Sequence, residues 1–258
     1  MKAVSAHPIA PGPLRCARGF TLVELMVSIT VALFLIGGIL TVVQHTRNTF
    51  LIQKQLAQLQ DSERIAMILM AGVVQSAGYY PAPNLNSAAT ALPVTAAFTS
   101  AGTPTVQGAH VNSAQGDTIT VRYAVAQNDN AFNCMGGQNT TVPLDTWENT
   151  FSVNAQNQLV CSLFRKSDGS TNTEVLVTGV TSLQITYGVN TTGGSTSTNS
   201  CVDTYITSQN MTTANWPNVC TVVVTLTFTN PVALAGGPNQ TVQFSRVIAV
   251  MNMVGVNT

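Results

Sequence analysis

Residues Phe20–Val43 read FTLVELMVSITVALFLIGGILTVV, and this stretch decides the fold. Every residue from Leu25 to Val43 is uncharged. At 1.5 Å per residue, a helix over the stretch is about 36 Å long, enough to cross a hydrocarbon layer of about 30 Å. A secretory signal has a shorter apolar core and ends at a small-residue cleavage site, whereas Gln44 and His45 follow here. The stretch therefore predicts a membrane-anchoring helix.

The segment before the apolar stretch is short and basic. Residues 1–19 contain Lys2, Arg15 and Arg18, no acidic residue, and end in Gly19. Basic flanks stay on the cytoplasmic side of a membrane helix, so we expect the rest of the chain to lie on the far side.

The overall composition excludes several classes of protein. Only 8% of the 258 residues are charged, with ten basic and ten acidic side chains, against about 25% in an ordinary soluble domain. A nucleic-acid binder needs a basic face, so that class is excluded. With 45% hydrophobic residues the chain is not expected to be disordered. Thr, Asn, Gln and Ser supply the polarity, which suits a β-rich extracytoplasmic protein.

Five cysteines are distributed unevenly along the chain. Cys16 lies in the leader, while Cys134, Cys161, Cys201 and Cys220 all follow the apolar stretch. This even set predicts two disulfides in an oxidising compartment. The spacings contain no CxxC and no paired histidine, so we expect no zinc site and no other metal. Three pairings are possible, and we favour the bonds between neighbours, Cys134–Cys161 and Cys201–Cys220.

Glu24 is the only charged residue in the apolar stretch. A carboxylate in hydrocarbon is costly, so it indicates a function and a cationic partner. If the chain is cut after Gly19, the new amine of Phe20 lies one helical turn from Glu24. Glu24 then either meets the amine of another subunit during assembly, or lies at the headgroup level and stabilises its own helix N-terminus.

The run Gly19-Phe20-Thr21-Leu22-Val23-Glu24-Leu25, placed after a basic leader and before an apolar run, resembles the processing site of type IV prepilins. The resemblance implies a membrane aspartyl peptidase that cuts after Gly19 and methylates the new N-terminus at Phe20. It also implies that Glu24 acts in subunit assembly. The fold class expected is α+β, the type IV pilin fold, in which a long N-terminal helix packs on an antiparallel β-sheet head.

The helix is predicted to continue beyond the membrane. Apolar residues recur at helical spacing and no proline interrupts the chain before Pro81, so one helix should extend from Phe20 to Tyr80. We therefore expect a leader at 1–19, a membrane-spanning or filament-core half of the helix at 20–44, an amphipathic half at 45–80, and a β-rich periplasmic head at 81–258. The apolar residues of the amphipathic half are Ile52, Leu56, Leu59, Ala66, Leu69 and Val73.

Period-two alternation predicts strands in the head, forming an antiparallel sheet with one face on the helix. The predicted strands are Thr118–Ala126, Leu159–Phe164, Val180–Val189, Thr221–Thr229 and Val242–Val250. A hairpin turn is predicted at Arg165–Gly169, and a low-complexity loop at Thr191–Ser200. No pattern is recognised in 82–116 or 190–218.

The run Val175–Val180, with Leu183 and Tyr187–Val189, resembles the head of PilW-type minor pilins. This implies a minor subunit of a type IV pilus, located first in the bacterial inner membrane and then at the cell surface. The implied partners are prepilin peptidase, other minor and major pilins, and a pilus-tip adhesin, with roles in assembly initiation, adhesion and twitching motility. The alternatives are a minor pseudopilin of type II secretion, or a membrane-anchored periplasmic binding domain or enzyme, which should have a deep polar pocket.

No catalytic motif or cofactor site is predicted. His45 and His110 have no nucleophile motif nearby, and no glycine-rich phosphate loop follows a strand. The carboxylates of Asp117, Asp129, Asp145 and Glu148 are expected at the surface. A calcium site at Asp168, Asn172 and Glu174 does not have EF-hand spacing and is disfavoured.

Overall fold

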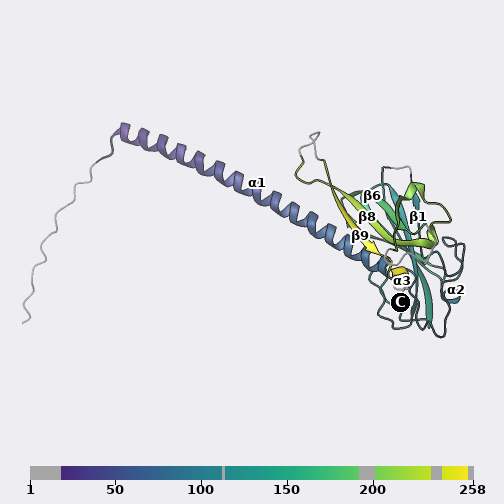
Figure 1. Cartoon of the computed structure of the whole chain (residues 1–258). Coiled ribbons are helices and arrows are strands. Elements are labelled where there is room, and N and C mark those ends of the chain that lie inside the picture. Colours follow the sequence, from purple (N-terminus) through teal and green to yellow (C-terminus); the bar gives the residue numbers. More distant parts are fainter. Residues whose placement is uncertain (1–18, 112–113, 192–200, 234–239, 255–258) are drawn as a thin grey trace, which may run out of the picture. The chain divides into compact units, whose positions relative to one another are not determined.

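The computed structural model describes residues 19–111, 114–191, 201–233 and 240–254. For residues 253 and 254 it describes the backbone only. The leader residues 1–18 and most of the predicted loop at 191–200 lie outside the described residues. The chain divides into two compact units, one ending at Leu51 and the other beginning at Ile52. Figure 1 shows a long N-terminal helix and a β-rich head, which is the α+β class expected from the sequence.

Helix α1 extends from Leu22 to Gln75 and ends before the predicted Tyr80. The cause is a contact with another part of the fold. Gly78 has a φ of +76°, in the left-handed region that glycine tolerates, and its N–H donates to the Arg122 carbonyl at 2.9 Å. A strand of the head therefore ends the helix earlier than Pro81 would.

The head contains two antiparallel sheets, where the sequence analysis expected one. Sheet 1 has the order β1-β2-β3-β4-β5, and sheet 2 has the order β7-β6-β8-β9. Sheet 1 consists of β1 (Val106–His110), β2 (Asp117–Ala126), β3 (Leu144–Val153), β4 (Gln158–Arg165) and β5 (Thr171–Thr178). Sheet 2 consists of β6 (Val180–Val189), β7 (Thr204–Thr207), β8 (Val219–Thr229) and β9 (Thr241–Ala249). Period-two patterns identify strands but not their partners, so they could not predict this division.

Five strands coincide with the predicted ones to within two residues at each end, namely β2, β4, β6, β8 and β9. The predicted turn at Arg165–Gly169 joins β4 to β5, with the Gly169 N–H donating to the Arg165 carbonyl at 2.9 Å. The sequence pattern does not predict β1, β3, β5 or β7 as strands. Short helical segments complete the described chain: α2 (Ala88–Ala91), η1 (Ser208–Asn210), η2 (Trp216–Asn218) and α3 (Met251–Val254).

One hydrophobic core joins the end of α1 to both sheets. Met70 and Val74 of the helix are fully buried, as are Ile119 of sheet 1 and Val224 of sheet 2. Alternate residues of β8 are buried in this core while their neighbours are partly exposed, as expected for a sheet with one face on the core.

Candidate functional site

The Gly19–Phe20 peptide bond lies just before α1, in non-helical backbone. Thr21 is the N-cap: its Oγ1 accepts from the Glu24 N–H at 3.3 Å and its carbonyl accepts from the Leu25 N–H at 3.2 Å. Phe20 is 78% exposed. Because no helical hydrogen bond must break, this bond is open to a peptidase.

The first part of α1 exposes its apolar side chains on all sides. It has a mean hydropathy of 2.5 over its most apolar window, which is long and apolar enough to cross a membrane. Phe34 is 85% exposed. The hydroxyls in this segment bond to the helix itself: Ser28 Oγ donates to the Glu24 carbonyl and Thr41 Oγ1 to the Gly37 carbonyl, both at 2.7 Å. These polar groups therefore need no external partner in an apolar environment.

Glu24 occupies the third position of α1, in the first helical turn. Its side chain is exposed, and it forms no salt bridge within residues 19–51. The Thr21-x-x-Glu24 spacing is that of a capping box, and a carboxylate in this turn is also favoured by the helix dipole. A carboxylate at this position is favourable for its own helix, and that of Glu24 is exposed and accessible to a cation.

Two disulfides lock the head. The structure bonds Cys134 to Cys161, with a Cα–Cα distance of 6.3 Å, and Cys201 to Cys220, with 5.9 Å. The first attaches the β2–β3 connection to β4, and the Cys134 N–H also donates to the Asn149 side-chain carbonyl at 2.9 Å. The second attaches the chain just before β7 to β8. Each sheet therefore carries one cross-link to a neighbouring loop.

Three of the four carboxylates expected at the surface are buried, so that expectation was wrong. Asp117, Asp145 and Glu148 are 4–6% exposed. Asp145 accepts hydrogen bonds from the Trp147 indole N–H at 3.0 Å and from both the N–H and hydroxyl of Ser167 at 2.9 Å. These partners meet only after the chain folds, so the sequence pattern gave no signal for them.

Asp117 joins the two sheets. One carboxylate oxygen bonds His110 Nδ1 at 2.7 Å across β1 and β2, and the other accepts from the Ile185 N–H of β6 at 2.8 Å. With both oxygens engaged, the Asp117–His110 pair serves as a structural link. Nucleophilic catalytic sites also contain an aspartate–histidine pair, but they need in addition a serine or cysteine side chain within hydrogen-bond reach of the histidine.

Arg122 is a second buried polar residue with several partners, and no sequence pattern marks it. It is fully buried under the segment 92–104. Its guanidinium donates to the carbonyls of Pro104 and Pro93 at 3.0 Å and of Ser100 at 2.7 Å, and it lies 4.4 Å from the Phe98 ring centroid. Burial lowers the pKa of Arg122 to about 10, while the Glu148 carboxylate acts in the opposite direction. It is therefore charged at neutral pH.

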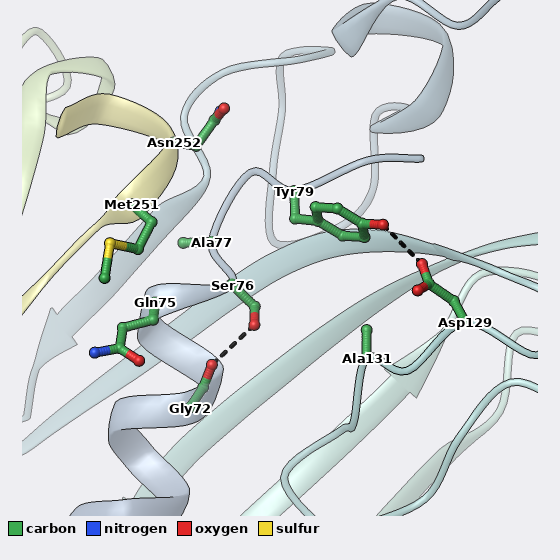
Figure 2. Close-up of a pocket in the computed structure, with 9 residues that line it drawn as sticks. All are labelled: Gly72, Gln75, Ser76, Ala77, Tyr79, Asp129, Ala131, Met251 and Asn252. Carbon is green, nitrogen blue, oxygen red and sulfur yellow. Dashed lines mark hydrogen bonds between the residues drawn. The ribbon is translucent and has the colours of Figure 1, made fainter. Parts of the chain in front are cut away.

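The head has an open pocket of about 510 Å³ beside the end of α1 (Figure 2). Gly72, Gln75 and Met251 line it, and the Tyr79 hydroxyl donates to the Asp129 carboxylate at 2.9 Å. Partial burial and the neighbouring Asp129 raise the pKa of Tyr79, so this hydroxyl stays protonated. The lining thus combines the Asp129 carboxylate, held by the Tyr79 hydroxyl, with mostly small and apolar neighbours in an open pocket.

Asp168, one of the three residues of the disfavoured calcium pattern, is engaged by neighbouring groups. Asp168 forms a salt bridge with Arg165 at 2.7 Å and accepts from the Ser170 N–H at 2.9 Å. Across the described ranges, no group of three or more His, Cys, Asp or Glu side chains is placed to hold a metal ion.

Two family models match the chain. The model of the prokaryotic N-terminal methylation motif matches residues 14–40, which include Gly19, Phe20 and Glu24. The model of type IV pilus-assembly protein W, or PilW, matches residues 123–246, from β2 into β9. The chain is a PilW-like protein of the type IV prepilin family. A search among curated proteins returns no match.

Membership of the type IV prepilin family connects the geometry to a biological system. The methylation motif implies processing by prepilin peptidase and association with other pilins. The exposed apolar helix fits anchoring in a membrane and association with a pilus. PilW-like proteins are pilus-related pilins, a family of generally non-enzymatic structural proteins.

Proposed function

We propose that this chain is a minor pilin that takes part in the initiation or tip complex of a type IV pilus. The observation that carries the proposal is the exposed apolar half of α1, joined in one helix to a disulfide-bonded head within the PilW match. We call this exposed apolar half of α1 the stalk. A helix with apolar side chains on every face needs lipid or other such helices around it. A PilW-type head favours the pilus over the related secretion machine as the place where those stalks gather.

Maturation defines the parts of the molecule. Cleavage after Gly19 removes the 1–19 leader, and methylation modifies Phe20. The leader holds three of the ten basic residues and no acidic one, so the mature net charge is −3. Residues 20–44 form the spanning or filament-core segment, the following helix to Gln75 enters the head, and residues 81–258 form the rest of the head.

Assembly moves the stalk from lipid into a core of similar helices. Both environments are apolar, so the transfer of hydrophobic surface changes the free energy little, and packing and polar pairing decide the outcome. Glu24 is the one acid in the stalk. Pairing with the N-terminal amine of a neighbouring subunit compensates the desolvation of both groups.

The location and partners follow from this scheme. The subunit spans the inner membrane once, with the head in the oxidising periplasm where Cys134–Cys161 and Cys201–Cys220 form. It then joins other minor and major pilins beneath a pilus-tip adhesin and supports adhesion and twitching motility. Its role is structural, without catalysis.

Processing is tested by mass spectrometry of the intact chain isolated from the pilus-bearing cell. The expected N-terminus is methylated Phe20, and its formation should require prepilin peptidase. A working subunit that keeps residues 1–19, or an N-terminus at another residue, refutes the assignment.

The assembly role is tested with Glu24→Ala. We expect a normally folded, disulfide-bonded head in the membrane, but loss of the subunit from sheared pili on immunoblots. Asp61→Ala is the matched control, because Asp61 is an exposed acid on the same helix, outside the apolar segment. If Glu24→Ala and Asp61→Ala enter pili equally well, Glu24 has no role in assembly.

A further inference from the structure

The two sheets of the head each end in a strand whose outer edge is unpaired. In the described residues, β5 has a neighbour only in β4, and β9 only in β8. Both are long for edge strands, and neither contains proline. Natural proteins usually protect such edges with short strands, prolines or charges, because free N–H and C=O groups template pairing with another chain.

Each edge carries one charged residue, and the two charges have opposite signs. Glu174 lies in β5 and Arg246 in β9, and both are exposed. Neither forms a salt bridge or side-chain hydrogen bond with the rest of the described head. The other charged side chains beyond Pro81 are buried, bonded, or, like Lys166, facing an opposite charge. Two unpartnered, complementary charges on two free edges point to contact between molecules.

The exposed apolar residues fit the same contact. Val175 of β5 is 50% exposed and Val247 of β9 is 59% exposed. If β5 and β9 of two molecules pair antiparallel with Glu174 opposite Arg246, then Thr173 lies opposite Val247 and Val175 opposite Ser245. The two valines become diagonal neighbours on one face, within contact distance. A single register therefore satisfies both the charges and the valines.

The length of the paired stretch is also defined. Leu176 is an extra residue relative to β4, since Val160 pairs with Val175 and Leu159 with Val177. A bulge of this kind bends a strand and ends regular pairing. Thr171–Val175 is the regular part of β5, and in this register it faces Ser245–Ala249, the last part of β9.

We propose that the free edge of β5 in one copy of this chain pairs with the free edge of β9 in a second copy, with Glu174 opposite Arg246. The contact uses different surfaces on the two partners, so it is heterologous and can repeat from head to head without closing. It is independent of the N-terminal assembly signal at Glu24.

The test is cysteine cross-linking of the full-length chain in membranes, in a Cys16→Ser background. The pair Thr173→Cys and Val247→Cys leaves both charges in place. A disulfide-linked dimer containing two differently tagged copies is expected when both substitutions are present, and not with either alone. A dimer from Val247→Cys alone indicates β9–β9 pairing and overturns the proposal, as does the absence of any dimer or a cross-link to another protein.

Charge reversal then tests the register. In the double-cysteine chain, Glu174→Arg places two arginines opposite each other, and we expect about tenfold weaker association. Adding Arg246→Glu should restore the cross-link yield. Asp168→Arg, in the turn before β5, is the matched control and should have no effect. Failure of the double reversal to restore the yield overturns the pairing of Glu174 with Arg246.

Discussion

Replacing Arg122 with methionine tests whether a buried cation holds the segment 92–104 on sheet 1. Methionine fills a similar volume but donates no hydrogen bond. The change removes three charge-assisted bonds to the carbonyls of Pro93, Ser100 and Pro104, each worth about 1.5–3 kcal/mol. The variant also regains some stability, because it no longer buries a charged guanidinium group. The drop in its pKa from 12.5 to about 10 corresponds to about 3 kcal/mol.

The balance is a loss of about 3 kcal/mol in the free energy of unfolding. The assay is urea unfolding of the detergent-solubilised full chain, followed by tryptophan fluorescence, since Trp147 is 2% exposed on the neighbouring strand β3. Limited proteolysis should show new cleavage within 92–104. Arg165→Met is the matched control, because Arg165 pairs with exposed Asp168 at the surface and such pairs contribute little. If both variants unfold at the same urea concentration, Arg122 does not hold the segment.

Three further predictions concern buried groups. Asp117→Asn should lower the free energy of unfolding by about 1–3 kcal/mol in the same urea assay, because charge-assisted bonds to His110 and β6 are lost. Burial raises the pKa of Glu148, so between the usual and the raised pKa the folded state binds more protons than the unfolded state. Stability therefore falls as the pH rises through that window. Glu148→Gln should remove this pH dependence in melting experiments, and an unchanged dependence would contradict the assignment to Glu148. Replacing Cys134 and Cys161 together with alanine should cost about 3–4 kcal/mol, from the 27-residue separation that the bond closes, and melting at constant pH should show it.

The sequence predicts those parts of the fold whose pattern is local. The β6 sequence VTSLQITYGV alternates clearly, and its bounds Val180–Val189 agree with the prediction. Strand β3 reads LDTWENTFSV and was missed because Asp145, Glu148 and Asn149 interrupt the alternation. All three are buried, and partners from distant segments make that possible. Asn149, for example, accepts from the Cys134 N–H.

The candidate sites divide in the same way. The N-terminal signal is contiguous in Gly19–Leu25, so one window of sequence contains it. The link through Asp117 needs β1, β2 and β6 together, and Arg122 needs a segment that begins 30 residues earlier at Leu92. No periodicity encodes such contacts, and the free edges of β5 and β9 become visible only when the strand order is known.

The disulfides have a mechanical consequence. A force along a filament pulls on its subunits, and a pulled domain lengthens only as far as its chain can be extended. Cys134–Cys161 withholds about 90 Å of extensible chain and Cys201–Cys220 about 65 Å, from separations of 27 and 19 residues. Because each sheet carries one disulfide, the head extends little under load. It therefore transmits tension to the neighbouring subunits instead of absorbing it.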